Sequence, residues 1–287
     1  QYKGELTMNL IKSSIRVCMQ KFRLSLTDIR VWMALVIVAI FIFTYEKDIF
    51  DYAQGINAEV TPWLFPFLNG QKFIRIILLL GPVLFFCNAP FVNSSNIYTV
   101  IRAGRNTLTI GNIIYIILFS ILYYIFIIIF SILPFVFNID WSFEWGTALG
   151  TLSMYPSENV IAIISGKITT FFSPLQAMFF TFLLSFICSV FLGLLIYAIN
   201  SITKTRFMGT VTAVFLILCE PLSRNFIKLM WFSPVSWSNI DYLSISSIDN
   251  LPTFEFAIIS YTTIIVALIT IIFFTNKHSD IMIIEEE

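Results

Sequence analysis

The sequence predicts an all-α integral membrane protein with six transmembrane helices. Hydrophobic residues make up 58% of the 287 residues and charged residues 12%, against roughly 25% charged in a soluble domain. The mean hydropathy is +0.87. A hydrocarbon core about 30 Å thick requires about 20 apolar residues of helix to cross it. The six predicted spans are Val31–Tyr45, Phe73–Val92, Ile110–Phe137, Pro174–Ile199, Phe207–Cys219 and Phe256–Thr275.

These apolar stretches are continuous and do not alternate with polar residues, which favours helices over a transmembrane barrel. The first and fifth stretches are short and the third is long, so tilting or local thinning of the bilayer is expected. No linker or low-complexity tract interrupts the chain. Residues 1–287 are therefore expected to form one transmembrane domain.

Residues 8–24, just before the first span, have the spacing of an amphipathic helix. The apolar side carries Ile11, Ile15, Cys18 and Phe22. The basic side carries Lys12, Arg16 and Arg23. A basic amphipathic helix beside a span is typical of a helix lying in the inner headgroup layer. The alternative is an ordinary cytoplasmic helix that docks on a partner. No signal peptide is recognisable, and Met8 is a candidate start of the native chain.

The distribution of Lys and Arg predicts that both termini lie in the cytoplasm of a multi-pass cell-membrane protein. Six basic residues precede the first span, namely Lys3, Lys12, Arg16, Lys21, Arg23 and Arg30. The two later inner loops contain basic residues without acids, namely Arg102, Arg105, Lys204 and Arg206. The outer gap with Arg224 and Lys228 is the weakest match to this pattern. Richness in Ile, Phe and Asn favours a bacterial source.

Prolines and glycines interrupt two of the spans. Gly81-Pro82 and Pro90 break the second span, which frees backbone carbonyls and permits a kink. Glu220-Pro221 is expected to end the fifth span. The following Leu222–Trp231 stretch is too short to cross the membrane and too apolar for a free loop. It therefore predicts a re-entrant hairpin on the outer side between spans five and six, with a plain outer loop as the alternative.

Two ionisable residues come close to the hydrocarbon. Arg75 opens the second span from the outer side, and Glu220 closes the fifth. Interfacial anchoring, in which the charged group reaches toward water, explains both positions. The alternative is that the two residues line a polar vestibule on the outer side, because charges embedded in membranes tend to be functional.

Catalytic and metal-binding patterns are missing from the sequence. The only histidine, His278, follows the last span, and the four cysteines lie in predicted helices rather than outer loops. No phosphate-binding loop is present, since Gly166-Lys167 lacks the upstream glycine. We therefore expect no catalytic residue, no metal and no cofactor in this chain, and no nucleic acid as a partner.

The segment Asn93–Leu108, between spans two and three, is the most informative inner loop. It carries Arg102 and Arg105 among small and polar residues, including Gly104 and Asn106. Such a segment can form a short capped helix with a basic surface facing the cytoplasm. Retention of positive charge on the inner side would explain the arginines equally well.

The whole chain resembles the membrane (permease) subunit of a type-2 ATP-binding-cassette (ABC) exporter. The corresponding features are the interfacial helix at residues 8–24, the six spans, a coupling helix at Asn93–Asn106 and an outer hairpin at Pro221–Trp237. The run Ile101–Asn106 is similar to the short Arg- and Gly-bearing run before the third span of small bacterial permeases. The outer segment Asn138–Ser173 is longer than in a minimal permease of this type, and the first inner loop is short.

The resemblance implies that this chain forms an export path and that separate ABC ATPase subunits bind ATP and Mg and supply the energy. Arg102, Gly104, Arg105 and Asn106 would form the loop that contacts the ATPase. A second permease subunit, identical or related, would complete the path within the membrane lipid. A path without fixed charge suits an amphipathic or hydrophobic substrate such as a lipid-like molecule, an antimicrobial peptide or a drug.

Other classes of function remain open at the level of sequence. An ion- or proton-coupled secondary carrier usually has acids or histidines inside its spans, and this chain has almost none. A membrane-embedded assembly or immunity factor would act without transport of its own. An intramembrane enzyme is the least favoured class, because catalytic groups are missing.

Overall fold

Helices make up most of the chain that the computed structural model describes, which is residues 2–90, 104–136, 139–156, 163–223, 226–245 and 250–278. Within these ranges the only strand-like pairings are two isolated bridges, Val60 with Ile139 and Ser244 with Thr253. The predicted all-α class is therefore confirmed. Four helical segments are long and apolar enough to cross a bilayer, so the protein is membrane-embedded. They are Ile29–Gly55, Arg105–Phe135, Pro174–Thr203 and Phe254–Lys277.

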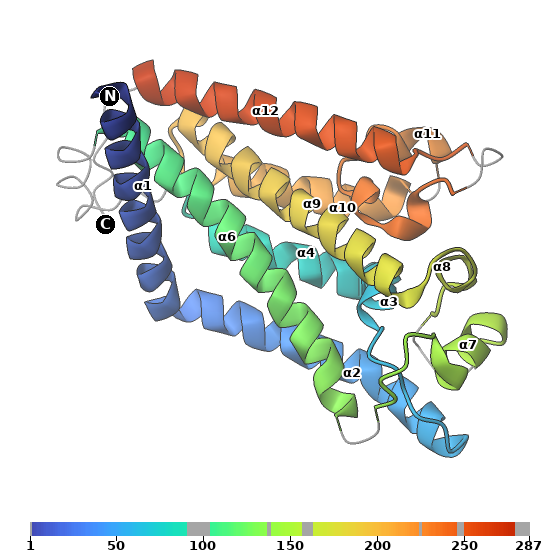
Figure 1. The fold of residues 1–287 in the computed structure, drawn as a ribbon. Helices are drawn as coiled ribbons and strands as arrows, with labels where there is room; N and C mark the ends of the chain where they lie inside the picture. The colour runs from blue at the N-terminus through green and yellow to red at the C-terminus, as the bar shows by residue number, and fades with distance from the viewer. Residues whose placement is uncertain are drawn as a thin grey trace.

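The main helices run back and forth between the same two ends of the molecule, as Figure 1 shows. They are α2 (Ile29–Gly55), α4 (Lys72–Phe86), α6 (Arg105–Ile132), α9 (Pro174–Thr203), α10 (Met208–Ser223) and α12 (Phe254–His278). We call the end that carries the amino-terminal helix the α1 end. The opposite end, called the α7 end, holds the short elements that connect the main helices. These are α3 (Phe65–Gly70), η2 (Leu133–Phe135), α7 (Gly146–Met154), α8 (Gly166–Phe171), α11 (Ile227–Met230), η3 (Ser236–Ser238) and η4 (Ile240–Tyr242).

Helix α2 is much longer than the first predicted span, which ended at Tyr45. The Asp28 side chain caps its start by accepting a hydrogen bond from the Arg30 amide at 2.9 Å. The helix then continues through the charged stretch after Tyr45 as far as Gly55. The helix is stabilised beyond Tyr45 because its inward-facing residues, among them Ile49 and Ala53, are buried against the bundle. Charge on the outward side ended the apolar stretch in the sequence but not the helix.

Helices α4 and α10 are the short members of the bundle, with 15 and 16 residues. At 1.5 Å per residue they are about 22 and 24 Å long, which is less than a hydrocarbon core of about 30 Å. The second predicted span extended to Val92, but α4 ends at Phe86. Helix α10 does not stop at Glu220-Pro221 as predicted and ends at Ser223. A proline loses one hydrogen bond to the preceding turn, and this loss does not by itself end a helix.

Helices α9 and α6, two of the other three long spans, agree with the prediction more closely. Helix α9 begins at Pro174, where the Ser173 amide donates to Gln176 Oε1 at 3.2 Å as part of a capping box. It ends before Lys204, which takes the left-handed conformation at φ 56°. Helix α6 starts five residues before the predicted span, directly after Gly104 at φ 82°.

The amino-terminal helix α1 (Tyr2–Thr27) lies across the α1 end of the bundle (Figure 1). It packs on α6 at a close crossing, where a Cβ on Gly111 would lie 2.7 Å from Val17 Cγ1. The Ser25 and Tyr115 hydroxyls are hydrogen-bonded at 2.5 Å. The predicted helix is confirmed, but its apolar side is divided. Cys18 is buried against the bundle, whereas Ile11 and Ile15 are exposed.

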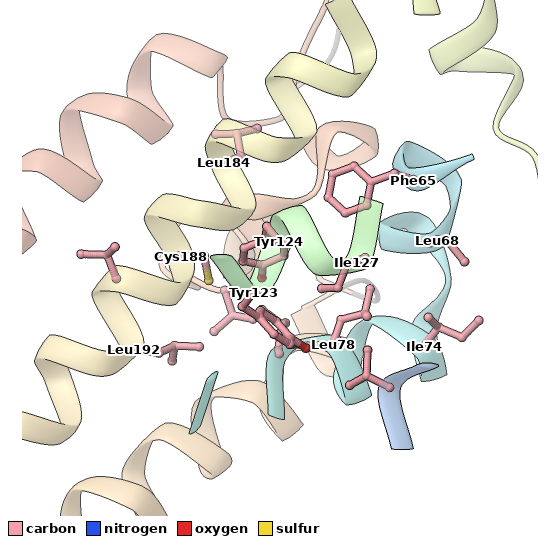
Figure 2. Close-up of a cluster of buried hydrophobic side chains, with 14 of the residues drawn as sticks. Phe65, Leu68, Ile74, Leu78, Tyr123, Tyr124, Ile127, Leu184, Cys188 and Leu192 are labelled. Carbon is pink, nitrogen blue, oxygen red and sulfur yellow. The ribbon is translucent and has the colours of Figure 1, made fainter. Parts of the chain in front are cut away.

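Helices α4, α6 and α9 meet in a tightly packed core. Figure 2 shows Leu184, Cys188 and Leu192 of α9 beside Tyr123 and Tyr124 of α6. The three α9 residues are four positions apart and therefore lie on one helix face. All five side chains are buried. A row of buried apolar side chains on α9 thus packs against two tyrosine rings on α6.

Tyr123 also repairs the hydrogen-bond defect that Pro82 creates in α4. Pro82 has no amide hydrogen, so the Leu78 carbonyl lacks its usual donor within the helix. The Tyr123 hydroxyl donates to that carbonyl at 2.7 Å. Gly81 leaves room for this contact, since a Cβ there would lie 2.3 Å from the Tyr123 hydroxyl. The freed carbonyl predicted from sequence therefore has a partner on α6.

This pairing predicts that Pro82 and Tyr123 are energetically coupled. Tyr123→Phe should lower the free energy of unfolding by about 1–3 kcal/mol, because the Leu78 carbonyl loses its partner in the interior. In a Pro82→Ala background the alanine amide can donate to that carbonyl, so the loss should shrink by about 1 kcal/mol. Denaturant unfolding of the purified chain in detergent measures both values.

Tyr124→Phe is the matched control, because the buried Tyr124 hydroxyl has no hydrogen-bond partner among the described residues. It should change stability by less than about 1 kcal/mol. An equal cost for Tyr123→Phe with and without Pro82 would show that the hydroxyl does not compensate for the proline.

The crossing of α1 and α6 gives a second prediction. Gly111→Ala places a methyl group against Val17 and should destabilise the docked α1 by about 1–3 kcal/mol. Gly150→Ala in α7 is the control, because nothing lies within 4 Å of the added atom. Hydrogen exchange of α1 amides should accelerate in Gly111→Ala alone. Unchanged exchange there would mean that α1 does not depend on this close approach.

Candidate functional site: a buried ion pair at the α7 end

Arg75 and Glu220 meet inside the protein. Arg75 lies in the first turns of α4 and Glu220 near the end of α10, and these helices approach each other toward the α7 end. Arg75 Nη1 and Glu220 Oε1 are 3.2 Å apart, and the two side chains are 0% and 1% exposed. The sequence placed both residues at span ends, as interfacial anchors or as the lining of a vestibule. The structure buries both away from solvent and pairs them, a contact that the sequence did not predict.

The second terminal nitrogen of Arg75 binds the segment that returns the chain from α10 to α12. Arg75 Nη2 donates to the Val235 carbonyl at 2.5 Å and to the Ser238 hydroxyl at 3.0 Å. The guanidinium carbon lies 5.6 Å from the centre of the Tyr242 ring, within the range of a cation–π interaction. One side chain on α4 thus contacts α10, η3 and η4.

Asn69 extends this polar cluster to two further elements. Its amide nitrogen donates to the Ser185 hydroxyl on α9 and to the Ser238 carbonyl, both at 3.0 Å. Asn69 is the penultimate residue of α3 and is 2% exposed. Helices α3, α4, α9 and α10 and the return segment are therefore joined through buried polar groups.

The return segment between α10 and α12 is tightly held at the α7 end. Trp237 Nε1 donates to the Met230 carbonyl at 2.8 Å, and the Ser223 and Ser236 hydroxyls are 2.6 Å apart. The Tyr261 hydroxyl of α12 donates to the Pro234 carbonyl at 2.5 Å. The Trp237 side chain is therefore held by backbone of its own segment.

Paired burial has a definite energetic consequence. Moving one charge into a protein interior costs several kcal/mol, and a partner with additional hydrogen bonds can recover that cost. Arg75 has both, since it is paired with Glu220 and donates to two oxygens of the return segment. Movement of α10 away from α4 would therefore have to separate two opposite charges inside the protein. The ion pair therefore resists separation of α4 and α10 at the α7 end.

An acidic groove opens nearby on the surface of the α7 end. It has a volume of about 930 Å³ and is lined by residues 57–59, 140, 142–147, 169 and 172–174. Three of its lining residues are the acids Glu59, Asp140 and Glu144. The Trp145 indole donates to the Phe172 carbonyl at 3.0 Å and so fixes one wall. No cluster of His, Cys, Asp and Glu able to hold a metal is found among the described residues.

The α1 end holds the residues predicted to contact an ATPase, as far as they are described. Gly104 precedes α6, and Arg105 and Asn106 are exposed in its first turn. Arg102 and most of the predicted coupling segment lie outside the described residues.

On α1, the basic residues predicted for the interfacial helix, Lys12, Arg16 and Arg23, are exposed. Lys21 was not singled out in the sequence, yet it is only 5% exposed. Burial lowers the pKa of Lys21 to about 8. A lysine whose pKa lies this close to neutral pH can lose its proton while it stays buried between α1 and the bundle.

Asparagines join the helix ends at the α1 end. Asn200 Nδ2 donates to the Ala89 carbonyl at 2.8 Å, and Asn200 Oδ1 accepts from the Gly209 amide at 2.8 Å. Asn276 Nδ2 on α12 donates to Thr109 Oγ1 and to the Tyr197 hydroxyl, both at 2.9 Å. Hydrogen bonds from neutral side-chain amides therefore connect the helices at the α1 end, whereas a buried ion pair connects them at the α7 end.

Sequence reasoning missed the acid at position 46. Glu46 directly follows the first predicted span, which ended at Tyr45, but it lies inside α2 and is 0% exposed. A usable signal was its spacing, because Ile42, Glu46, Ile49 and Ala53 follow one face of a helix that continues past Tyr45.

Comparison with known protein families, with curated proteins and with solved structures finds no match to this chain.

The ion pair gives a prediction about stability. Glu220→Leu should lower the free energy of unfolding by about 3–5 kcal/mol, because it leaves the Arg75 guanidinium buried without its counter-charge. The double variant Arg75→Met/Glu220→Leu should lose less than the sum of the two single variants, with a coupling energy of about 1–3 kcal/mol. Thermal and denaturant unfolding in detergent measure this cycle.

Glu255→Leu is the control, because Glu255 is exposed at the start of α12. It should change stability by less than about 1 kcal/mol. Additive losses from Arg75→Met and Glu220→Leu would show that the two charges do not depend on each other.

Proposed function

We propose that this chain is the membrane subunit of an ATP-driven exporter. In this proposal α2, α4, α6, α9, α10 and α12 all cross the bilayer, with the α1 end in the cytoplasm. The observation that carries the proposal is the direction of the chain. Each of these helices begins at the end where the preceding one finishes (Figure 1). If all six helices cross the bilayer, the start of α2 and the end of α12 lie on the same side of the membrane.

The charge at the two ends supports this orientation. Exposed basic residues gather at the α1 end, on α1 itself, at Arg105 and at Lys204. The groove at the α7 end carries three acids and no basic lining residue. Basic residues prefer the cytoplasmic side of a membrane protein. The exposed Ile11 and Ile15 on α1 are suited to contact lipid headgroups and the upper acyl chains.

Helices α4 and α10 can belong to membrane spans although they are short, because neighbouring elements cover the rest of the membrane thickness. Helix α3 precedes α4 at the α7 end, and the return segment follows α10 at the same end. Irregular backbone is tolerated at membrane depth when it is buried in protein. Buried Ser236, Trp237 and Ser238 meet that condition, which supports a re-entrant hairpin between the last two spans.

The energy source in this proposal is a separate ABC ATPase that holds ATP and Mg. The chain would contact it through Arg102, Gly104, Arg105 and Asn106, where α6 begins at the α1 end. Closure of the ATPase pair on ATP would rock α6 and the helices packed on it. A second permease subunit would complete the path for an amphipathic or hydrophobic substrate. ATP can drive the cycle only if it binds one state of the assembly better than the other.

An ion-coupled carrier is the second candidate, and the interior charges favour it. The sequence disfavoured this class because the predicted spans contain almost no acids or histidines. The structure places Glu46 within α2 and Glu220 within α10, both buried. Ionisable residues at membrane depth are costly and are usually functional. A carrier would move its substrate without any ATPase, which separates the two candidates by experiment.

The exporter proposal predicts that reversing charge at the start of α6 uncouples ATP hydrolysis. The full chain is purified from its native membrane in lipid nanodiscs, and ATP hydrolysis of the co-purified material is measured. Arg102→Glu/Arg105→Glu should lower that activity about tenfold, which corresponds to about 1.4 kcal/mol of lost contact energy.

Lys204→Glu reverses an exposed charge in the connection between α9 and α10, which also lies at the α1 end. This variant should leave the activity unchanged. The thermal stability of all variants is compared, so that loss of folding is not mistaken for loss of coupling. Preparations without any ATPase, or normal hydrolysis in the double variant, would remove this function from consideration.

A further inference from the structure

The carboxyl group of Glu46 is buried and has no partner in the part of the chain that the structure describes. It lies in α2, one residue before the exposed Lys47, and is itself 0% exposed. Neither carboxyl oxygen has a hydrogen-bond partner among the described residues. The one buried salt bridge found in that part of the chain joins Arg75 to Glu220 and does not include Glu46.

The helices packed around α2 offer Glu46 no available counter-charge. Helix α4 carries Lys72, which is exposed, and Arg75, which is paired with Glu220. Neither α7 nor η2 has an ionisable side chain. The other main contacts of α2 are with α6 and α1. Asp241 of η4, which lies near the adjacent Tyr45, is an acid and offers no counter-charge. Helix α6 carries Arg105, Tyr115, Tyr123 and Tyr124. The basic and acidic residues of α1 are Lys3, Glu5, Lys12, Arg16, Lys21 and Arg23.

These remaining groups are distant or occupied. Arg105 and α1 belong to the α1 end, whereas Glu46 is about 26 Å along α2 from its start. The Tyr115 hydroxyl is hydrogen-bonded to Ser25, and the Tyr123 hydroxyl to the Leu78 carbonyl. The Tyr124 hydroxyl is buried and carries no charge that could offset a carboxylate.

An ionised carboxylate in such a place would be very costly. Burial of an unpaired charge costs several kcal/mol even after relaxation, whereas a neutral acid costs no more than a buried polar group. We propose that Glu46 is a proton-binding site. It holds its proton as a neutral carboxylic acid in this conformation. It gives the proton to water when α2 moves away from the bundle, leaving a carboxylate and a hydronium ion.

The position of Glu46 along α2 fits exchange with the solvent at the α7 end. Gly55 lies nine positions further along the helix, which is about 14 Å. Lys47 beside Glu46 already reaches the surface. A small opening on this side is therefore enough to wet the carboxyl group. A metal ion is a poorer occupant, because hard cations need several oxygen ligands and the described residues offer no such cluster.

The proton site goes beyond the proposed exporter function and stands without it. In an exporter it would make the conformational cycle sensitive to pH. In an ion-coupled carrier it would supply the coupled ion. The test below uses the purified chain without an ATPase or a transported substrate, so its failure would leave the exporter proposal intact.

Infrared spectroscopy of the full chain in lipid nanodiscs tests the protonation directly. The difference between wild type and Glu46→Gln at neutral pH should contain the carbonyl band of a protonated carboxylic acid, shifted in heavy water. Glu59→Gln is the matched control, because Glu59 is exposed after the same helix, and its difference spectrum should contain carboxylate bands. Carboxylate bands in the Glu46→Gln difference would overturn the proposal.

The pH dependence of stability tests it independently. A group that binds a proton in the folded state and releases it on unfolding makes stability fall as pH rises. Between about pH 5 and about pH 8 the melting temperature of wild type should therefore fall by several degrees relative to Glu46→Gln and Glu46→Leu. Glu46→Leu should be at least as stable as wild type at the upper pH, because it removes no pairing.

Two results would overturn the proposal. Parallel melting curves for wild type and both Glu46 variants across this range would show that no proton is bound or released there. A melting temperature of wild type that rises with sodium, but not with choline at equal ionic strength, would show that the carboxylate binds a cation instead.

Discussion

The arrangement of the bundle depends on the contact between Arg75 and Glu220. One charge comes from α4, the other from α10, and the same guanidinium also binds the segment that leads into α12. Inside a membrane, apolar contacts between helices give little preference over contacts with lipid tails, so polar contacts carry much of the specificity. A single ion pair with its hydrogen bonds can therefore decide which helices are neighbours at the α7 end.

The two ends of the molecule are fastened by different chemistry, which bears on how it could move. Neutral amides join α9, α10 and α12 at the α1 end through Asn200 and Asn276. Amide contacts can exchange partners at moderate cost, whereas a buried ion pair resists separation because each charge would be left alone. A transport cycle driven from the α1 end would thus meet its largest electrostatic barrier at Arg75–Glu220. Glu46 adds a third element, whose charge depends on whether α2 is packed or wetted.

More of the fold than of the candidate site could be predicted from the sequence. Apolar stretches of about 20 residues identify long helices because the bilayer demands them, and α9 agrees with the prediction at its start. Charged residues after Tyr45 hid the end of α2, since a helix can keep one buried face while the other carries charge. Arg75 and Glu220 were both recognised as unusual. Their distance in the chain gave no sign that they pair.

The sequence by itself determined that the chain is helical and belongs in a membrane, because hydropathy and hydrogen-bond satisfaction act locally along each segment. It also determined which end of the bundle is basic. Only the tertiary structure decided which polar side chains are partners and that the buried carboxyl group of Glu46 has no partner among the described residues. Pairing across helices depends on how distant segments approach in space. Residues 145 positions apart, such as Arg75 and Glu220, carry no local signal of that approach.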